Sequence, residues 1–205
     1  MIKQVLIELI QESLPQIDKT SKYHDLVVEK YITMAANTIL GNLFRKNSSG
    51  YDLYAKDYNA TIVYDTDTDQ YHSLYPAPIV QTIDPYNGVR SINTPKGKGL
   101  QFAPIRAGEM LFYEDTVVSK LSSVIPYIPE RSGVLFVGKP VDNFNQTIVS
   151  IRMKLVVPFT EYDSDEFFHI PAGSDLEFID TVLQLMGRIP PKDLLNDEKD
   201  PQWKQ

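Results

Sequence analysis

Apolar residues recur at helical spacing along the N-terminal part of the chain and predict two amphipathic helices. The first helix covers residues 2–14, and Pro15 ends it because proline disfavours helical geometry in the residue before it. Thr20 and Ser21 are candidate N-caps for the second helix, which runs to the polar stop at residues 47–50. Two short helices cannot bury both apolar faces alone, so they need the rest of the chain or a neighbouring molecule.

The second helix carries three small residues, Ala35, Ala36 and Gly41. Small side chains let another backbone approach closely. We therefore expect these helices, and these three residues in particular, to form an interface between subunits.

From residue 47 the helical period gives way to short β-branched and aromatic runs that are typical of strands. The polar segment Asp65–Asp69 is a turn, so the strands on its two sides are expected to form a hairpin. The last strand alternates partly, which suits a sheet with one wet face. The expected strands are 60–64, 71–75, 89–92, 111–113, 133–138 and 147–157, with a short helix at 116–124.

A third helix is predicted over residues 172–188. Ser174 and Glu177 form a capping box, in which the serine caps the third helical amide and the glutamate reaches back. Gly187 is the expected C-cap, and Pro190–Pro191 prevents the helix from continuing. The expected apolar face consists of Leu176, Ile179, Val182, Leu183 and Met186.

Residues 189–205 have the composition of an extended tail that is rich in charge. Leu194, Leu195 and Trp203 are large apolar residues in a segment that cannot form its own core. Such residues commonly anchor on another surface, but a tail can equally fold back on its own domain or stay disordered. The sequence leaves these alternatives open, with the three apolar residues as candidate partner contacts.

The order of these elements predicts an α+β protein. The N- and C-terminal helices are expected to form a small helical bundle, with a β-rich domain inserted between them and an extended C-terminal tail. The expected parts are an N-terminal helical pair at 1–46, a β-rich domain at 47–171, a C-terminal helix at 172–188 and the tail at 189–205.

Composition narrows the classes of function. The 205 residues include no cysteine, which excludes disulfides, thiolate metal sites and thiol nucleophiles. A net charge of −7 disfavours non-specific nucleic-acid binding over the whole surface. No apolar run approaches the roughly 20 residues that span a bilayer, so no membrane association is expected.

Candidate chemistry is sparse along the chain. The carboxylates of Asp65–Asp69 start like a calcium loop, but Gln70 replaces the turn glycine and Pro76 stands where a bidentate Glu is needed. His24, His72 and His169 have no zinc-like spacing. Neither a nucleophile elbow nor a phosphate-binding loop is present. We expect no catalytic residue, no cofactor and no metal site, and hence no enzyme.

Two charged segments have both a functional and an ordinary interpretation. Glu161, Asp163, Asp165 and Glu166 could form a metal or acid/base group, but a charge run in a loop is more often simply solvated. Residues 95–99 form a small basic loop that could touch phosphate, although two lysines fit a plain loop tip better.

The C-terminal pattern from Ile170 to Ile179, followed by the segment 190–197, resembles the end of head–tail connector proteins of crAss-like, short-tailed bacteriophages. The helical pair from Tyr23 to Phe44 looks like the start of the same proteins. The resemblance covers both ends of the chain and not its middle. Its motifs are structural and carry no catalytic signature.

The resemblance implies a ring protein of the virion, assembled in the host cytoplasm. Such connectors form a homo-oligomeric ring, usually a dodecamer, beneath the portal protein and next to other tail rings. Double-stranded DNA passes through the channel without sequence-specific contact, and an acidic wall keeps it from sticking. The alternative is a tail-hub, baseplate or capsid-auxiliary protein whose β domain attaches a fibre, and a third interpretation is a phage hydrolase.

Overall fold

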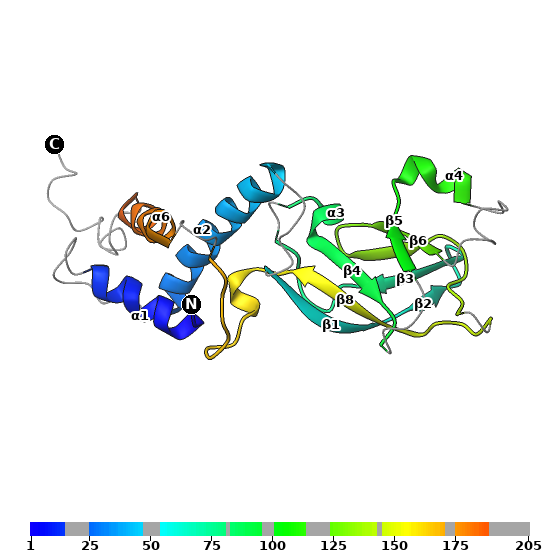
Figure 1. Cartoon of the computed structure of the whole chain (residues 1–205), viewed down its shortest axis with the longest axis horizontal. Coiled ribbons are helices and arrows are strands. Elements are labelled where there is room, and N and C mark those ends of the chain that lie inside the picture. Colours follow the sequence, from blue (N-terminus) through cyan, green and yellow to red (C-terminus); the bar gives the residue numbers. More distant parts are fainter. Residues whose placement is uncertain are drawn as a thin grey trace, which may run out of the picture. The chain divides into compact units, whose positions relative to one another are not determined.

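The computed structural model describes residues 1–14, 25–46, 54–80, 83–95, 101–113, 124–142, 145–170 and 175–188 (Figure 1). It contains helices and two β-sheets, which confirms the α+β class. The chain divides into two compact units. The helical unit combines Met1–Asn42 with Pro158–Gln205, and the β unit is the continuous stretch Leu43–Val157.

The helical unit contains α1 (Lys3–Ser13), the first part of α2 (Asp25–Lys46), the short turn η4 (Phe159–Glu161) and α6 (Asp175–Arg188). The three predicted helices are thus confirmed. Each of them buries a row of apolar side chains within the chain, as the helical period predicts. The fully or nearly fully buried helical side chains are Leu6, Ile7, Ile10, Val28, Ile32, Ala35, Ala36, Leu40, Phe178, Val182 and Met186.

Helix α6 differs from the sequence prediction in two respects. It continues through Gly187 to Arg188, so Gly187 lies inside the helix and is not its C-cap. Its buried row is Phe178, Val182 and Met186, spaced four residues apart, whereas Leu176 is 78% exposed. The expected capping box cannot be followed, because Ser174 lies outside the described residues.

The sequence pattern predicts that the β-rich block ends at residue 171. In the structure, the residues from Pro158 onward belong to the helical unit. Aromatic packing gives the physical reason. Phe168 contacts Phe159, Tyr162 and, on α6, Phe178, with ring centroids 5.0, 5.2 and 6.2 Å away. This segment therefore contributes side chains to the core of the helical unit.

The β unit has one sheet of three strands in the order β1-β8-β4 and one of five in the order β2-β3-β7-β6-β5. All neighbouring strands are antiparallel except β5 and β6, which are parallel. The strands are β1 (Ala55–Thr61), β2 (Val63–Asp65), β3 (Gln70–Leu74), β4 (Val89–Asn93), β5 (Gln101–Pro104), β6 (Val124–Pro129), β7 (Gly133–Phe136) and β8 (Ser150–Val156).

The predicted hairpin around Asp65–Asp69 is confirmed by the β2–β3 pairing, in which Asp65 lies opposite Gln70. Only Ile62 separates β1 from β2, so one chain segment passes from the three-stranded sheet to the five-stranded sheet. The predicted alternation of β8 is also confirmed. Ile151 and Met153 are fully buried, while Arg152 between them is exposed.

Two strands, β5 and β6, are missing from the sequence prediction. Pro126 and Pro129 obscure β6 in the sequence pattern, because proline lacks the amide with which a central strand normally donates a hydrogen bond. Its carbonyls still accept hydrogen bonds, for example at Pro126 from the Val137 amide at 3.0 Å. The expected helix at 116–124 lies mostly outside the described residues, and Val124 itself begins β6.

The expected strand at 111–113 is wrong, because Met110–Tyr113 form the short helix α4. It follows the 3-10 turn η3 (Ala107–Glu109), where a carboxylate oxygen of Glu109 accepts the Arg106 amide at 3.0 Å and starts the helical turn. Met110 and Tyr113 then pack on the buried cluster of Ile105, Ile128 and Val137. A separate short helix, α3 (Pro85–Gly88), precedes β4.

Glycine substitutions test this architecture at two contrasting positions. A Cβ atom at Gly133 would lie 2.3 Å from the Ser73 carbonyl oxygen on the neighbouring strand, whereas at Gly187 it meets nothing within 4 Å. We expect Gly133→Ala to lower the free energy of unfolding by about 2–3 kcal/mol. Gly187→Ala, inside α6, should raise it by about 0.5–1 kcal/mol. Chemical denaturation measures both, and an unaffected Gly133→Ala protein would contradict the close β3–β7 contact.

Candidate functional site

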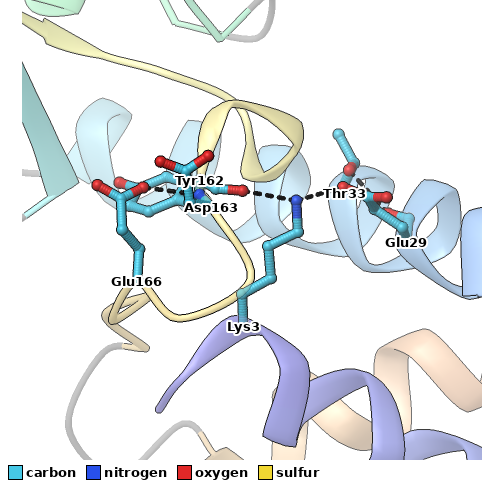
Figure 2. Close-up of polar contacts among 6 residues, drawn as sticks. All are labelled: Lys3, Glu29, Thr33, Tyr162, Asp163 and Glu166. Carbon is cyan, nitrogen blue, oxygen red and sulfur yellow. Dashed lines mark hydrogen bonds and ion pairs between the residues drawn. The ribbon is translucent and has the colours of Figure 1, made fainter.

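A buried lysine ties the helical unit together (Figure 2). Lys3 is only 8% exposed. Its Nζ lies 2.5 Å from a carboxylate oxygen of Glu29 on α2 and donates a hydrogen bond to the Tyr162 carbonyl at 2.7 Å. The same ammonium lies 5.2 Å from the ring centroid of Phe159. One cation on α1 thus joins α2 and the segment that follows β8.

The backbone at the start of α1 is fixed by the same segment. The Lys3 and Gln4 amides donate to the carbonyls of Glu166 and Ser164 at 2.9 and 3.1 Å. No side chain caps this helix, so these carbonyls satisfy amides that a helix start otherwise leaves without partners. The Phe168 amide donates to the Met1 carbonyl at 2.7 Å, which extends the contact.

The acidic segment 161–166 forms a turn that presents these carbonyls. A side-chain oxygen of Glu166 accepts the Asp163 amide at 2.8 Å, and the Glu166 amide donates to the Asp163 carbonyl at 3.0 Å. The carboxylate of Glu166 therefore has a structural role, whereas Asp163 takes part through its backbone. The sequence pattern alone does not distinguish that role from plain solvation.

Three apolar side chains stay exposed around this junction. Ile2 is 42%, Val5 46% and Phe167 56% exposed, and Ile2 and Phe167 are bridge partners in an antiparallel β-bridge. We call these three residues the junction patch. Phe168 beside them is 3% exposed, because the extended backbone turns successive side chains to opposite sides. The patch is therefore held by backbone hydrogen bonds and presents apolar surface to solvent.

The sequence does contain a signal for the buried lysine. Lys3 shares the helical face of Leu6, Ile7 and Ile10, where every other residue is apolar. A charged residue on a buried face must find partners. The exposure of Phe167 carries no comparable signal, since Phe167 and Phe168 are the same residue type at adjacent positions.

The predicted interface residues of α2 lie inside the chain. Ala35 is 0% and Ala36 2% exposed, and Gly41 is buried as well. Their small size suits packing within this molecule, and their part in an interface between subunits stays a prediction. A larger side chain at Ala36 would disturb folding before it tested assembly. Leu194, Leu195 and Trp203 lie outside the described residues.

In the Asp65–Asp69 turn, the carboxylate of Asp65 accepts hydrogen bonds from within the turn itself. The Asp65 side chain accepts the Asp67 amide and the Thr68 hydroxyl, each at 2.9 Å. These two bonds hold the pKa of Asp65 below its ordinary value, because they stabilise the charged form. In the part of the chain that the structure describes, no three His, Asp or Glu side chains are grouped so that they could hold a metal ion.

The two units differ strongly in charge. The helical unit has 8 basic and 16 acidic residues, a net charge of −8, whereas the β unit has 12 basic and 11 acidic residues, a net charge of +1. The acidity of the chain therefore belongs to the helical unit. That unit also carries seven of the large apolar side chains exposed in the described ranges: Ile2, Val5, Leu26, Val27, Met34, Phe167 and Leu176.

The fold and these contacts define an α+β protein with a helical unit and a β unit. No protein-family model matches the chain, and no curated protein matches its sequence at a significant level. Among the described helices, none is long and apolar enough to cross a membrane.

The Lys3 junction can be tested by removing either charge or both. Lys3→Ala leaves Glu29, whose side chain is 18% exposed, without its cation and leaves the Tyr162 carbonyl without this donor. We expect a loss of about 3 kcal/mol in unfolding free energy, typical of a broken buried pair. The double variant Lys3→Met with Glu29→Leu should recover part of that loss, because no buried charge remains unpaired. Denaturation of both proteins decides this, and a double variant no more stable than Lys3→Ala would contradict a coupled pair.

Proposed function

We propose that this protein is a virion structural protein, a subunit of a head-to-tail connector ring that joins portal to tail and lines the DNA channel. The observation that carries the proposal is the junction patch, an apolar surface on a rigidly bonded part of the helical unit. The resemblance of the chain ends to phage connector proteins supports the class. Assembly, not catalysis, is the proposed role.

The junction patch suits a protein interface for a physical reason. Exposed large apolar side chains gain free energy when a partner covers them, at about 25 cal/mol per Å² of apolar area. The Ile2–Phe167 bridge and the amide bonds of Lys3 and Gln4 already fix the backbone. Binding of a partner at this patch therefore costs little conformational entropy, because the backbone is already ordered. In a ring, the same patch contacts a neighbour in every subunit.

The charge distribution supports a place for the helical unit at the channel. With a net charge of −8, this unit repels the phosphate backbone of passing DNA, which prevents adhesion without base-specific contact. The nearly neutral β unit lacks that repulsion. We propose that the helical unit is a small bundle facing the channel, and that the tail at 189–205 reaches onto a neighbouring subunit.

A second candidate function has its own observation in the β unit. Val63 and Leu74 are 51% and 65% exposed on strands β2 and β3. Val63 lies opposite His72, and Leu74 follows His72 by two residues, so all three share one face of the sheet. An exposed apolar sheet face suits attachment of a fibre. This observation favours the alternative of a tail-hub, baseplate or capsid-auxiliary protein.

Charge substitutions on the two surfaces separate these functions. Val5→Glu and Phe167→Glu place a carboxylate in the junction patch, while Leu74→Glu does the same on the β2–β3 face as a matched control. All three positions are 46–65% exposed, so each variant should keep a wild-type melting temperature within a few degrees. We expect the purified wild type and Leu74→Glu to form rings in electron micrographs, and both patch variants to remain small.

Size-exclusion chromatography with light scattering gives the same comparison in solution. Rings in both patch variants would show that the junction patch is not part of the interface between subunits. Loss of assembly only in Leu74→Glu would favour the fibre-attachment alternative.

A further inference from the structure

Strand β1 is the longest of the described edge strands in the β unit. The sheet edges are β1 and β4 in the three-stranded sheet and β2 and β5 in the five-stranded sheet. A β-bulge interrupts β4 between Val89 and Ser91, β5 ends at Pro104, and β2 has only three residues. Bulges, prolines and short length are ways in which proteins protect a sheet edge from pairing. In contrast, β1 has seven residues and pairs with β8 along its whole length without a bulge.

The hydrogen bonds of β1 to β8 leave every second backbone unit facing away from the sheet. The β1–β8 register continues one residue beyond Thr61, where the Ile62 amide donates to the Val149 carbonyl at 2.8 Å. In an antiparallel pair, successive residues alternate between bonding to the partner strand and facing away from it. The amides and carbonyls that face away therefore belong to Ala55, Asp57, Asn59 and Thr61.

These four positions form an accessible row along the edge. Asp57, Asn59 and Thr61 are exposed and Ala55 is half-buried. Among the described residues, no backbone hydrogen bond outside the β1–β8 pairing involves any of the four. A row of alternating donors and acceptors at this spacing is complementary to another β-strand. The edge therefore favours an extended strand as its occupant.

We propose that β1 pairs in antiparallel orientation with β1 of a second copy of this chain. A twofold axis at Tyr58 places Asp57 opposite Asn59 of the second copy. This register uses all four outward positions, in pairs that exchange about eight hydrogen bonds. An axis at Asp57 or at Asn59 leaves one pair fewer. The axis at Asp57 also puts two carboxylates directly opposite each other, which destabilises a sheet.

The side chains on the exposed face of β1 fit the Tyr58 register. The side-chain amide of Asn59 is a donor and the opposite Asp57 carboxylate is an acceptor, so the two groups are complementary. The charge of Asp57 is already balanced within its own molecule, because a guanidinium nitrogen of Arg152 lies 2.9 Å from its carboxylate. Two copies of Asp57 thus meet only diagonally, each beside a cation.

The side chains on the other face of β1 fit the same register. Tyr58 lies opposite Tyr58 of the second copy, and cross-strand aromatic pairs stabilise sheets. Lys56 lies opposite Ala60, whose small side chain leaves room for the lysine. No two like charges are directly opposed on either face. The sequence of β1 is therefore compatible with pairing to itself.

This contact goes beyond the proposed ring. A ring interface joins two different surfaces of neighbouring subunits, whereas a twofold contact uses the same strand of both copies and closes after two subunits. It joins two three-stranded sheets into one continuous sheet. No residue of the junction patch takes part, so the two contacts can be tested separately.

Single cysteines test the contact and its register, because the chain has no cysteine of its own. A chain with Asp57→Cys and a chain with Asn59→Cys bring directly opposite residues to a Cα separation of about 5.5 Å, within reach of a disulfide. In either variant alone the equivalent residues lie diagonally, roughly 9 Å apart and out of reach. Mild oxidation of the mixed chains should therefore give a covalent dimer, and each variant alone about tenfold less or none.

Thr66→Cys is the matched control for the cysteine experiment. Thr66 in the β2–β3 turn is exposed, as is Asn59 on the edge. A mixture of Thr66→Cys and Asn59→Cys should stay monomeric in denaturing electrophoresis. A covalent dimer of similar yield in this control would mean that random collision produces the crosslink.

A proline at the edge tests the backbone contact without cysteine. Asn59→Pro removes an amide that faces away from β8, so the pairing within the molecule should survive. Asn59→Ala keeps that amide and is the matched control. Both changes are made in the Val5→Glu chain, which removes the proposed ring contact. Light scattering should give a dimer for Val5→Glu alone and with Asn59→Ala, and a monomer with Asn59→Pro. Circular dichroism should show the same secondary structure in all three.

The other outcomes overturn this proposal. No dimer in the mixture of Asp57→Cys and Asn59→Cys would mean that β1 does not pair with itself. A dimer in one of these variants alone would mean a different register. Equal masses for Asn59→Pro and Asn59→Ala would exclude the backbone contact. Absence of rings in wild-type micrographs, with the mixed disulfide still formed, would refute the proposed function and leave this contact standing.

Discussion

The organisation of the helical unit depends on the burial of one cation, the ammonium of Lys3. A charge removed from water must be paired and hydrogen-bonded, or it destabilises the fold by several kcal/mol. Glu29 supplies the counter-charge from α2, and the Tyr162 carbonyl supplies an acceptor from the segment after β8. Three parts of the sequence that lie far apart are thereby brought together, and the rotation of α1 about its axis is fixed.

That rotation determines which apolar residues remain outside. With Lys3, Leu6 and Ile10 turned inward, Ile2 and Val5 face solvent. The extended backbone after the acidic turn buries Phe168 and exposes Phe167. The same contacts therefore stabilise the core and create an apolar surface, on the unit that also holds the excess of negative charge. The proposed assembly role of this unit rests on that surface.

The β unit depends on a different constraint, the close approach of backbones. The segment through Ile62 passes from one sheet to the other, where the Ile62 amide donates to the Val149 carbonyl at 2.8 Å. At Gly133 the β3 and β7 backbones come too close for any side chain. Prolines in β6 remove donors from a central strand, while α4 packs against its apolar side chains. These features depend on steric fit between neighbouring strands more than on local propensity.

The sequence by itself determined the α+β class, the three long helices, the β2–β3 hairpin and the alternation of β8, because each depends on a local period or turn chemistry. It did not determine the partners of Lys3, the inward packing of Ala35 and Ala36, the exposure of Leu176, or strands β5 and β6. Each of these is decided by which distant segment packs against which face. A period in sequence shows that a face is apolar, but only the tertiary structure decides how much of that face the chain itself covers.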